Sequence, residues 1–274
     1  MDLSQTQKLV VSPLRKARLH RLYLVPISLG LGLGLWYLIA RVGDFPAFIL
    51  PTPDLVFRRL IQALSDGTLQ RHSWYTLVEV LAGLALGVST ATTLGYLLAK
   101  SRAFERLLAP YIVASQSIPV VAIAPLLVIW FDTGMFSKVL ICALIVFFPV
   151  LVNTVVGLRS VPEELHELMR SLKANPWQTF RLLEVPASLP VFLGGLRIGA
   201  TLAVIGAVVG EFVGADRGLG FLISVGRGQY DTALVFVAVF SLIVMALSLY
   251  TSITWLEARL LSWQQRPEQP TLSE

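Results

Sequence analysis

The sequence predicts an all-α protein that crosses a membrane several times, as its composition and its long apolar runs indicate. Hydrophobic residues make up 55% of the 274 residues and charged residues only 14%, and the mean hydropathy is +0.72. A soluble domain is roughly 45–50% apolar and about 25% charged, so an ordinary soluble globule is excluded. A disordered chain, which has few apolar residues, is excluded as well. The single cysteine, Cys142, excludes a disulfide scaffold and a cysteine-based metal site.

Six stretches are long and apolar enough to cross a bilayer, whose hydrocarbon core requires about 20 apolar residues. They cover residues 22–40, 75–99, 107–131, 136–158, 189–213 and 232–255. Pro119 and Pro125 interrupt the third stretch and Pro149 interrupts the fourth. A membrane bundle tolerates such prolines because neighbouring helices can bond the freed carbonyls. Glycines in the second and fifth stretches indicate close packing, so we expect a bundle of six transmembrane helices.

The first apolar stretch follows a basic leader, residues 1–21, which raises the alternative of a cleaved signal peptide. Its apolar run is longer than a signal-peptide core of roughly 7–15 residues, and no A-x-A cleavage site follows it. We interpret this stretch as a retained membrane anchor. The chain then divides into the leader, a six-span domain over residues 22–257 and a polar tail over residues 258–274.

The distribution of positive charge predicts the orientation of the bundle. Apart from Arg197, 14 Lys and Arg residues lie on the side of the two termini and 7 lie on the other side. Because cytoplasmic loops carry the excess of Lys and Arg, both termini should be cytoplasmic. The cations are spread over the loops and form no stripe interleaved with aromatic residues, so a nucleic-acid partner is not expected.

One polar segment, residues 159–188, has too regular a pattern for a plain loop. Ser160 and Glu163 have the spacing of a capping box, and Pro162 suits the first turn of a helix. An apolar stripe at helical spacing follows, formed by Leu165, Leu168, Met169 and Leu172. The pattern predicts a short amphipathic helix at the membrane surface.

A second start signal follows directly, with Asn175 as the N-cap and Gln178 three residues later. Val185 and Pro186 should end this second helix, which is sharply joined to the first. The pair could anchor the bundle to lipid headgroups, but helices that bind lipid are mostly basic. The segment instead holds four acids, Glu163, Glu164, Glu167 and Glu184, which favours a cytoplasmic protein partner.

The stretch from Glu167 to Pro186 resembles the EAA motif of ABC-importer permeases. That motif reads E-A-A, three residues, Gly, nine residues and I-x-L-P. Glu167, Lys173, Leu183, Val185 and Pro186 fall on it without a gap, although Leu168 and Met169 replace the alanines and Lys173 replaces the glycine. The resemblance implies a segment that couples to a separate ATPase. The residues that it implicates are Glu163, Glu164, Glu167, Leu168, Met169, Arg170, Lys173, Trp177 and Pro186.

Further segments resemble permeases of the nitrate, sulfonate and taurine branch. They are residues 48–53, 117–125 followed by Trp130 and Phe131, 147–153, 195–197 and 218–223. The resemblance implies a type I ABC importer permease fold in the bacterial inner membrane, with the coupling helix pair between spans four and five. It also implies a homodimer that is served by two ATP-binding subunits and an extracytoplasmic substrate-binding protein.

The chain itself shows no catalytic machinery. It has no phosphate-binding G-x-x-x-x-G-K-[ST] loop, so ATP and Mg should be bound by the partner subunit. His20, His72 and His166 lie in separate segments without the H-E-x-x-H spacing of a metal site. We therefore expect no enzyme activity, cofactor or metal in this chain.

Several polar residues in the spans are candidates for a translocation pathway or gate. They are Ser115, Gln116, Ser117, Pro119, Asn153, Arg197 and Glu211. Bonding between helices explains such residues at least as often as substrate contact does. Arg197, about eight residues inside the fifth span, could be structural or part of an inner gate. Glu79, near the start of the second span, should be partly exposed to water.

The sequence does not identify one substrate. Residues 115–117 resemble those of permeases for thiamine-pyrimidine precursors or related heterocycles, which implies such a solute, while sulfonate or taurine, nitrate and bicarbonate are alternatives. Two other classes of protein also remain. An ion-coupled secondary transporter should show an inverted repeat and acids in mid-span, and a membrane scaffold should tolerate the loss of Glu167.

Overall fold

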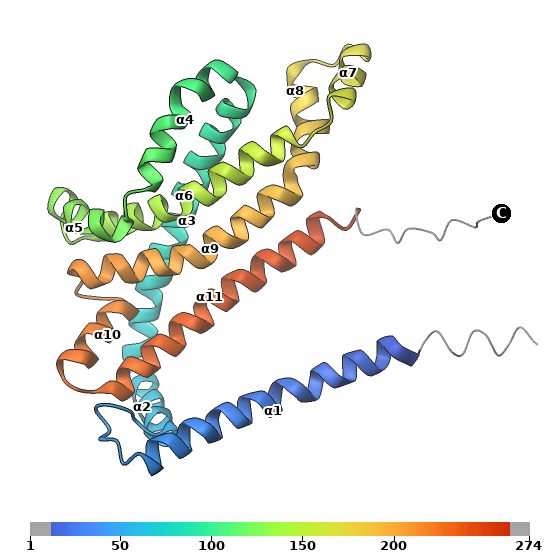
Figure 1. The fold of residues 1–274 in the computed structure, drawn as a ribbon. Coiled ribbons are helices and arrows are strands. Elements are labelled where there is room, and N and C mark those ends of the chain that lie inside the picture. The colour runs from blue at the N-terminus through green and yellow to red at the C-terminus, as the bar shows by residue number, and fades with distance from the viewer. Residues whose placement is uncertain (1–11, 264–274) are drawn as a thin grey trace, which may run out of the picture.

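The computed structural model describes residues 12–263, with side chains for residues 26–28 and 30–263, and every element in this range is helical. The elements are α1 (Ser12–Val42), α2 (Pro53–Ser65), α3 (Thr68–Lys100), α4 (Arg102–Gln116), α5 (Val120–Phe131), α6 (Met135–Arg159), α7 (Glu163–Ser171), α8 (Pro176–Thr179), the π-helix η1 (Phe180–Glu184), α9 (Val185–Gly214), α10 (Leu219–Gly228) and α11 (Thr232–Leu260) (Figure 1). All of the expected leader and most of the expected tail lie outside the described side chains.

The core of the bundle lies where α3, α6 and α9 pack against one another. Its central residues include Val80, Val146 and Ala203, none of which is exposed. The helices approach closely at Cys142 of α6. A Cβ on Gly83 would lie 2.2 Å from the Cβ of Cys142, and one on Gly206 would lie 2.8 Å from its Cα. The glycines of the second and fifth spans thus permit the close packing that the sequence predicts.

Four helical segments in the described range are long and apolar enough to cross a membrane: Thr68–Lys100, Met135–Arg159, Pro176–Gly214 and Thr232–Leu260. The expected third span is instead two helices, α4 and α5, bent by 95° where Pro119 caps α5. Proline cannot donate an amide bond and disfavours helical backbone in the residue before it. Pro125 and Pro149 lie within α5 and α6 without ending them. The described apolar part of α1, Pro26–Val42, is shorter, so a count of six stays a prediction.

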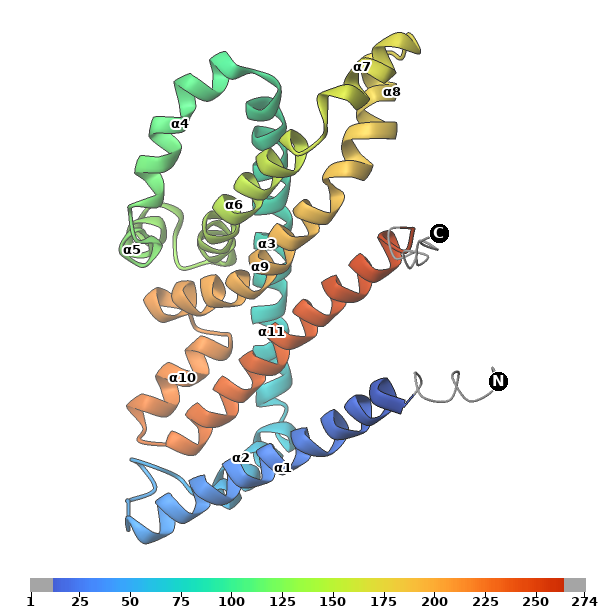
Figure 2. The same ribbon diagram turned by 45° about the vertical axis from the view of Figure 1, so that its right-hand side comes forward.

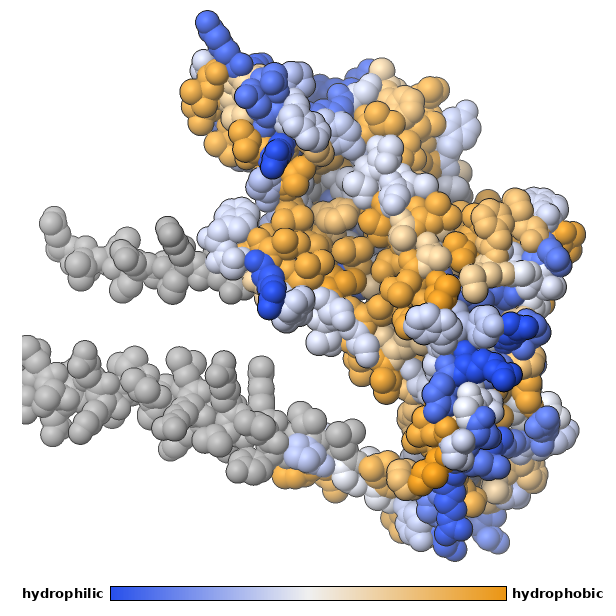
Figure 3. Space-filling view, turned by 180° about the vertical axis from the view of Figure 1, so that it is seen from behind, coloured by the Kyte–Doolittle hydropathy of each residue, from blue (hydrophilic) through white to orange (hydrophobic). Residues whose placement is uncertain are grey.

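The two ends of the bundle differ. At one end α7 and α8 project away from the long helices, and at the other end α2 and α10 lie beside the start of α11 (Figure 1). Near the C-terminal end of α1, Trp36 stacks on Phe236 of α11 with ring centroids 5.1 Å apart, and from there the two helices diverge (Figure 2). Apolar residues cover much of the middle of the face in Figure 3, as expected for a surface in contact with lipid.

Buried polar contacts fix the end that carries α10. The Oε1 of Glu211 accepts a hydrogen bond from the Thr76 hydroxyl at 2.7 Å, and its Oε2 accepts one from the Gly220 amide. Glu79 interacts with Glu211 and is only 4% exposed. The expectation that Glu79 is partly exposed to water is therefore wrong. The loop before α10 packs against this part of α3, where the Gly218 amide donates to His72 and the Leu219 amide donates to Thr76.

Candidate functional site

Residues 159–188, from the last residue of α6 to the first turn of α9, form a projection at one end of the bundle, and we call them the coupling segment (Figure 1). Its first helix, α7, agrees with the expected amphipathic helix. Its second helix is not a separate element, because α8 continues through η1 directly into α9. The expectation that Val185 and Pro186 end it is wrong. The Val185 amide instead bonds to the Phe180 carbonyl five residues back, a π-helical turn that accommodates the proline that follows.

The start of α7 differs from the expected capping box. Ser160 is the C-cap of α6, and its hydroxyl donates to the Gly157 carbonyl at 2.8 Å. It is therefore not available to α7, whose N-cap is Pro162. Glu163 and Glu164 occupy the first turn of α7, where the helix dipole favours negative charge. Glu163 also pairs with Arg170, and both side chains are mostly exposed.

The turn after α7 is a Schellman motif with Lys173 at its left-handed position. The Lys173 amide donates to the Arg170 carbonyl at 2.9 Å, and the Ala174 amide donates to the Met169 carbonyl at 3.0 Å. Lys173 has a φ of 53°, in the region where glycine is preferred at this position. The residue that replaces the motif glycine therefore keeps the backbone conformation that the glycine would adopt.

The start of α8 confirms the second predicted cap. The Asn175 side chain accepts from the Gln178 amide at 2.8 Å, and the Gln178 side chain accepts from the Asn175 amide at 2.8 Å. This capping box directs the chain out of the turn and into α8. The local sequence thus fixes both the stop of α7 and the restart that leads into α9.

Most of the coupling segment is exposed, and no residue of α7 is buried. Leu168 is 53% exposed, Leu172 67% and Trp177 65%. Glu163, Glu164, Glu167, Arg170 and Lys173 are exposed as well, whereas Met169 and Pro186 are half-buried. Apolar side chains gathered among charges at a projecting surface are typical of a protein interaction site. The structure therefore brings the predicted coupling residues together.

The pathway candidates, in contrast, do not form one site. Ser115 and Gln116 end α4, and Ser117 and Pro119 form the bend before α5, where all four are exposed. The remaining three candidates, Asn153, Arg197 and Glu211, lie elsewhere in the bundle.

Each of those three has a contact with a neighbouring part of the fold. Asn153 donates to the Pro149 carbonyl at 2.8 Å, and a Cβ on Gly195 of α9 would lie 2.5 Å from its Cβ. Arg197 pairs with Glu257 of α11. Glu211 holds the α10 loop, as described above.

Two ion pairs at the coupling segment were not predicted. Arg159 binds Glu105, and Lys100 binds Glu184. The partners lie 54 and 84 residues apart in the chain, and no local pattern indicates such pairing. Among the described residues, no group of three or more His, Cys, Asp or Glu side chains could hold a metal ion.

The fold and the site define a helical membrane protein with several spans and a projecting segment suited to docking. The chain belongs to the family of binding-protein-dependent transport system inner membrane components, whose sequence pattern matches residues 83–262. Members of this family are transport components of ABC importers, and this chain is such a permease.

Two relatives with assigned transport systems match along most of their length. The riboflavin transport system permease protein of Chloroflexus aurantiacus is 49% identical over 240 residues, which is 88% of this chain and 90% of the relative. The formylaminopyrimidine transport permease protein of Halalkalibacterium halodurans is 39% identical over 232 residues, 85% of this chain and 92% of the relative.

A solved structure has the same fold. The inward-facing MetNI methionine ABC transporter matches with a TM-score of 0.62 and 19% identity, over 70% of this chain and 95% of the matched chain. The predicted all-α, type I importer permease fold is confirmed.

Proposed function

We propose that two copies of this chain form the translocation pathway of an ATP-driven importer in the bacterial inner membrane. Two ATP-binding subunits, which hold ATP and Mg, dock on the coupling segments, and an extracytoplasmic binding protein delivers the solute at the opposite end. Both termini are cytoplasmic, in agreement with the 14 to 7 distribution of Lys and Arg.

The observation that carries this proposal is the exposed helix α7, which a short turn joins to the continuous helix formed by α8, η1 and α9. Leu168 and Glu167 supply an apolar and a charged contact for a groove in the ATPase. A displacement of α8 passes into η1 and α9, because no loop interrupts these elements. Packed helices respond to such displacements as rigid bodies, so closure of the ATPase pair would move α9 and switch the pathway between inward and outward access.

We assign the solute to the small heterocycles, with a thiamine-pyrimidine precursor or a flavin-like vitamin as the leading candidates. The names of the two relatives, which refer to riboflavin and formylaminopyrimidine, support this class. The pairing of Arg197 with Glu257 is compatible with this class, because the solute need not supply a counter-ion to Arg197. Sulfonate or taurine, nitrate and bicarbonate are the alternatives.

The test has two parts. Co-expression with the neighbouring ATPase and binding protein should yield a complex that survives detergent purification and takes up solute only with ATP. Purification of the chain alone, or uptake driven by an ion gradient without ATP, would contradict the proposal and favour a scaffold or a secondary transporter. Calorimetry of the binding protein with riboflavin, formylaminopyrimidine and taurine identifies the solute class, and tight binding of taurine alone would overturn the heterocycle assignment.

A further inference from the structure

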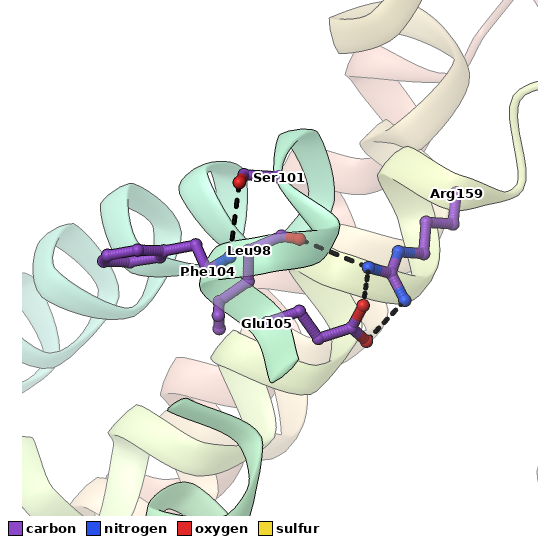
Figure 4. Close-up of polar contacts among 5 residues, drawn as sticks. All are labelled: Leu98, Ser101, Phe104, Glu105 and Arg159. Atoms are coloured by element: carbon purple, nitrogen blue, oxygen red, sulfur yellow. Dashed lines mark hydrogen bonds and ion pairs between the residues drawn. The ribbon is translucent and has the colours of Figure 1, made fainter. Parts of the chain in front are cut away.

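The coupling segment is tied at both of its ends to one corner of the bundle. This corner, residues 98–105, comprises the end of α3, Ser101 and the first turn of α4. Ser101 is at once the C-cap of α3 and the N-cap of α4, and its amide donates to the Leu97 carbonyl at 3.1 Å. Its hydroxyl accepts a hydrogen bond from the Phe104 amide at 3.3 Å (Figure 4). A single extended residue therefore separates the two helices.

The first tie is made by Arg159, the last residue of α6. Its guanidinium donates two parallel hydrogen bonds to the Glu105 carboxylate, at 2.7 and 2.6 Å, and one to the Leu98 carbonyl at 3.2 Å (Figure 4). This bidentate pair fixes the relative orientation of the guanidinium and the carboxylate as well as the distance between them. Arg159 thus holds the end of α3 and the start of α4 at the point where the coupling segment begins.

The second tie is made by Lys100, the last residue of α3. Its ammonium group binds Glu184, the last residue of η1, whose side chain is only 2% exposed. The other carboxylate oxygen of Glu184 is buried without a hydrogen-bond partner among the described residues. A buried carboxylate depends strongly on its one ionic partner. Lys100 therefore holds the corner at the point where the coupling segment passes into α9.

The corner matters because α4 has few other attachments. None of its residues is buried, and it leans on the core through the partly buried Leu108 and Ile112. At its far end, about 22 Å away at the helical rise per residue, lies the 95° bend to α5. The corner is thus a main determinant of the positions of α4 and of the bend relative to the core.

We propose that Arg159–Glu105 and Lys100–Glu184 form a clamp that transmits the displacement of the coupling segment to α4 and, through it, to the bend at residues 117–119. These four are positioning residues. The inference rests on the proposed function, in which an ATPase displaces α7. It adds a second route of transmission, through α4, to the direct route through η1 and α9.

The decisive variant is Glu105→Gln, which keeps the shape of the side chain and removes its charge. Arg106→Gln is the matched control, since Arg106 is exposed in the same turn of α4 and forms no ion pair among the described residues. The purified complex of permease, ATPase and binding protein is placed in proteoliposomes, and solute uptake per ATP hydrolysed is measured. We expect Glu105→Gln to lower this ratio at least about fivefold, the lower end of typical coupling between sites, with ATPase assembly retained.

The double variant Glu105→Arg with Arg159→Glu should restore at least half of the ratio, because it rebuilds the pair with the charges exchanged. An unchanged ratio in Glu105→Gln would overturn the clamp. An equal loss of the ratio in Arg106→Gln would also overturn the clamp. A proportional fall of uptake and hydrolysis in Glu105→Gln would do so as well, because it indicates a general loss of folded protein.

A second measurement does not depend on transport. Hydrogen exchange of the same complex should be faster in α4 when Glu105 is replaced, and unchanged in η1, whose tie to Lys100 stays intact. Protection that stays the same in α4 would contradict the clamp even if the complex transports normally. If the wild-type complex hydrolyses ATP but moves no solute, the proposed function fails, while the exchange result still decides on the clamp.

Discussion

Replacing Lys173 with glycine should stabilise the turn that ends α7. Lys173 has a φ of 53°, and the left-handed conformation costs an ordinary L-residue about 1–2 kcal/mol. Glycine adopts it freely but loses more chain entropy on folding, which offsets about 0.5–1 kcal/mol. The net gain is on the order of 0.5–1 kcal/mol, or about two- to fivefold in the population of the closed turn.

Hydrogen exchange of the amides in residues 170–175 measures this gain. The amides of Lys173 and Ala174 close the turn, with bonds of 2.9 and 3.0 Å, so Lys173→Gly should slow their exchange by about that two- to fivefold factor. Lys173→Ala removes the charge but keeps the Cβ, and it should leave exchange unchanged. Ser171→Gly, at the last residue of α7, should instead speed exchange, because glycine loses more chain entropy when this end of the helix forms. Equal slowing by Lys173→Gly and Lys173→Ala would show that charge, and not backbone conformation, limits the turn.

Three further substitutions test other parts of the account. Glu167→Ala should weaken binding of the ATPase to the purified permease by roughly tenfold, as expected when a contact worth about 1–2 kcal/mol is lost, and unchanged binding would remove Glu167 from the docking surface. Asn175→Ala should cost about 1 kcal/mol of helix-capping energy and speed exchange in α8, whereas normal protection there would contradict the capping box. Gly206→Ala places a Cβ 2.8 Å from the backbone of α6 and should lower the melting temperature in detergent, since overpacking costs about 1–3 kcal/mol. Gly194→Ala, which meets nothing within 4 Å, is its control, and equal melting of the two variants would refute the close-packing argument.

The features that the sequence predicted correctly are those encoded by neighbouring residues. The long apolar runs indicated the main helices, and the spacing of Asn175 and Gln178 indicated the capping box that the structure contains. The Ser160 box failed because the same residue serves as the C-cap of α6, and local spacing does not show which helix a serine serves. Pro186 did not end a helix because a π-helical turn accommodates it, which depends on how α8 continues into α9.

The features that the sequence did not predict depend on residues far apart in the chain. The pairs Arg159–Glu105 and Lys100–Glu184 form only when α3, α4, α6 and η1 come together at one corner. Glu79 looked accessible by its depth in the span, yet it is only 4% exposed and interacts with Glu211 of α9. Burial and pairing of this kind follow from the packing of helices and not from the pattern within one helix.

Site-specific cross-linking tests most directly whether the coupling segment docks on an ATPase. The native Cys142 is fully buried, so Leu168→Cys provides a reactive thiol on the exposed face of α7. Phe57→Cys, on α2 at the opposite end of the bundle and 61% exposed, provides the control. A short cysteine-reactive photo-cross-linker on Leu168→Cys should join the permease to the co-purified ATP-binding subunit, and the same reagent on Phe57→Cys should not. Cross-links from Leu168→Cys to lipid alone, or equal cross-linking of the ATPase from both positions, would contradict the account.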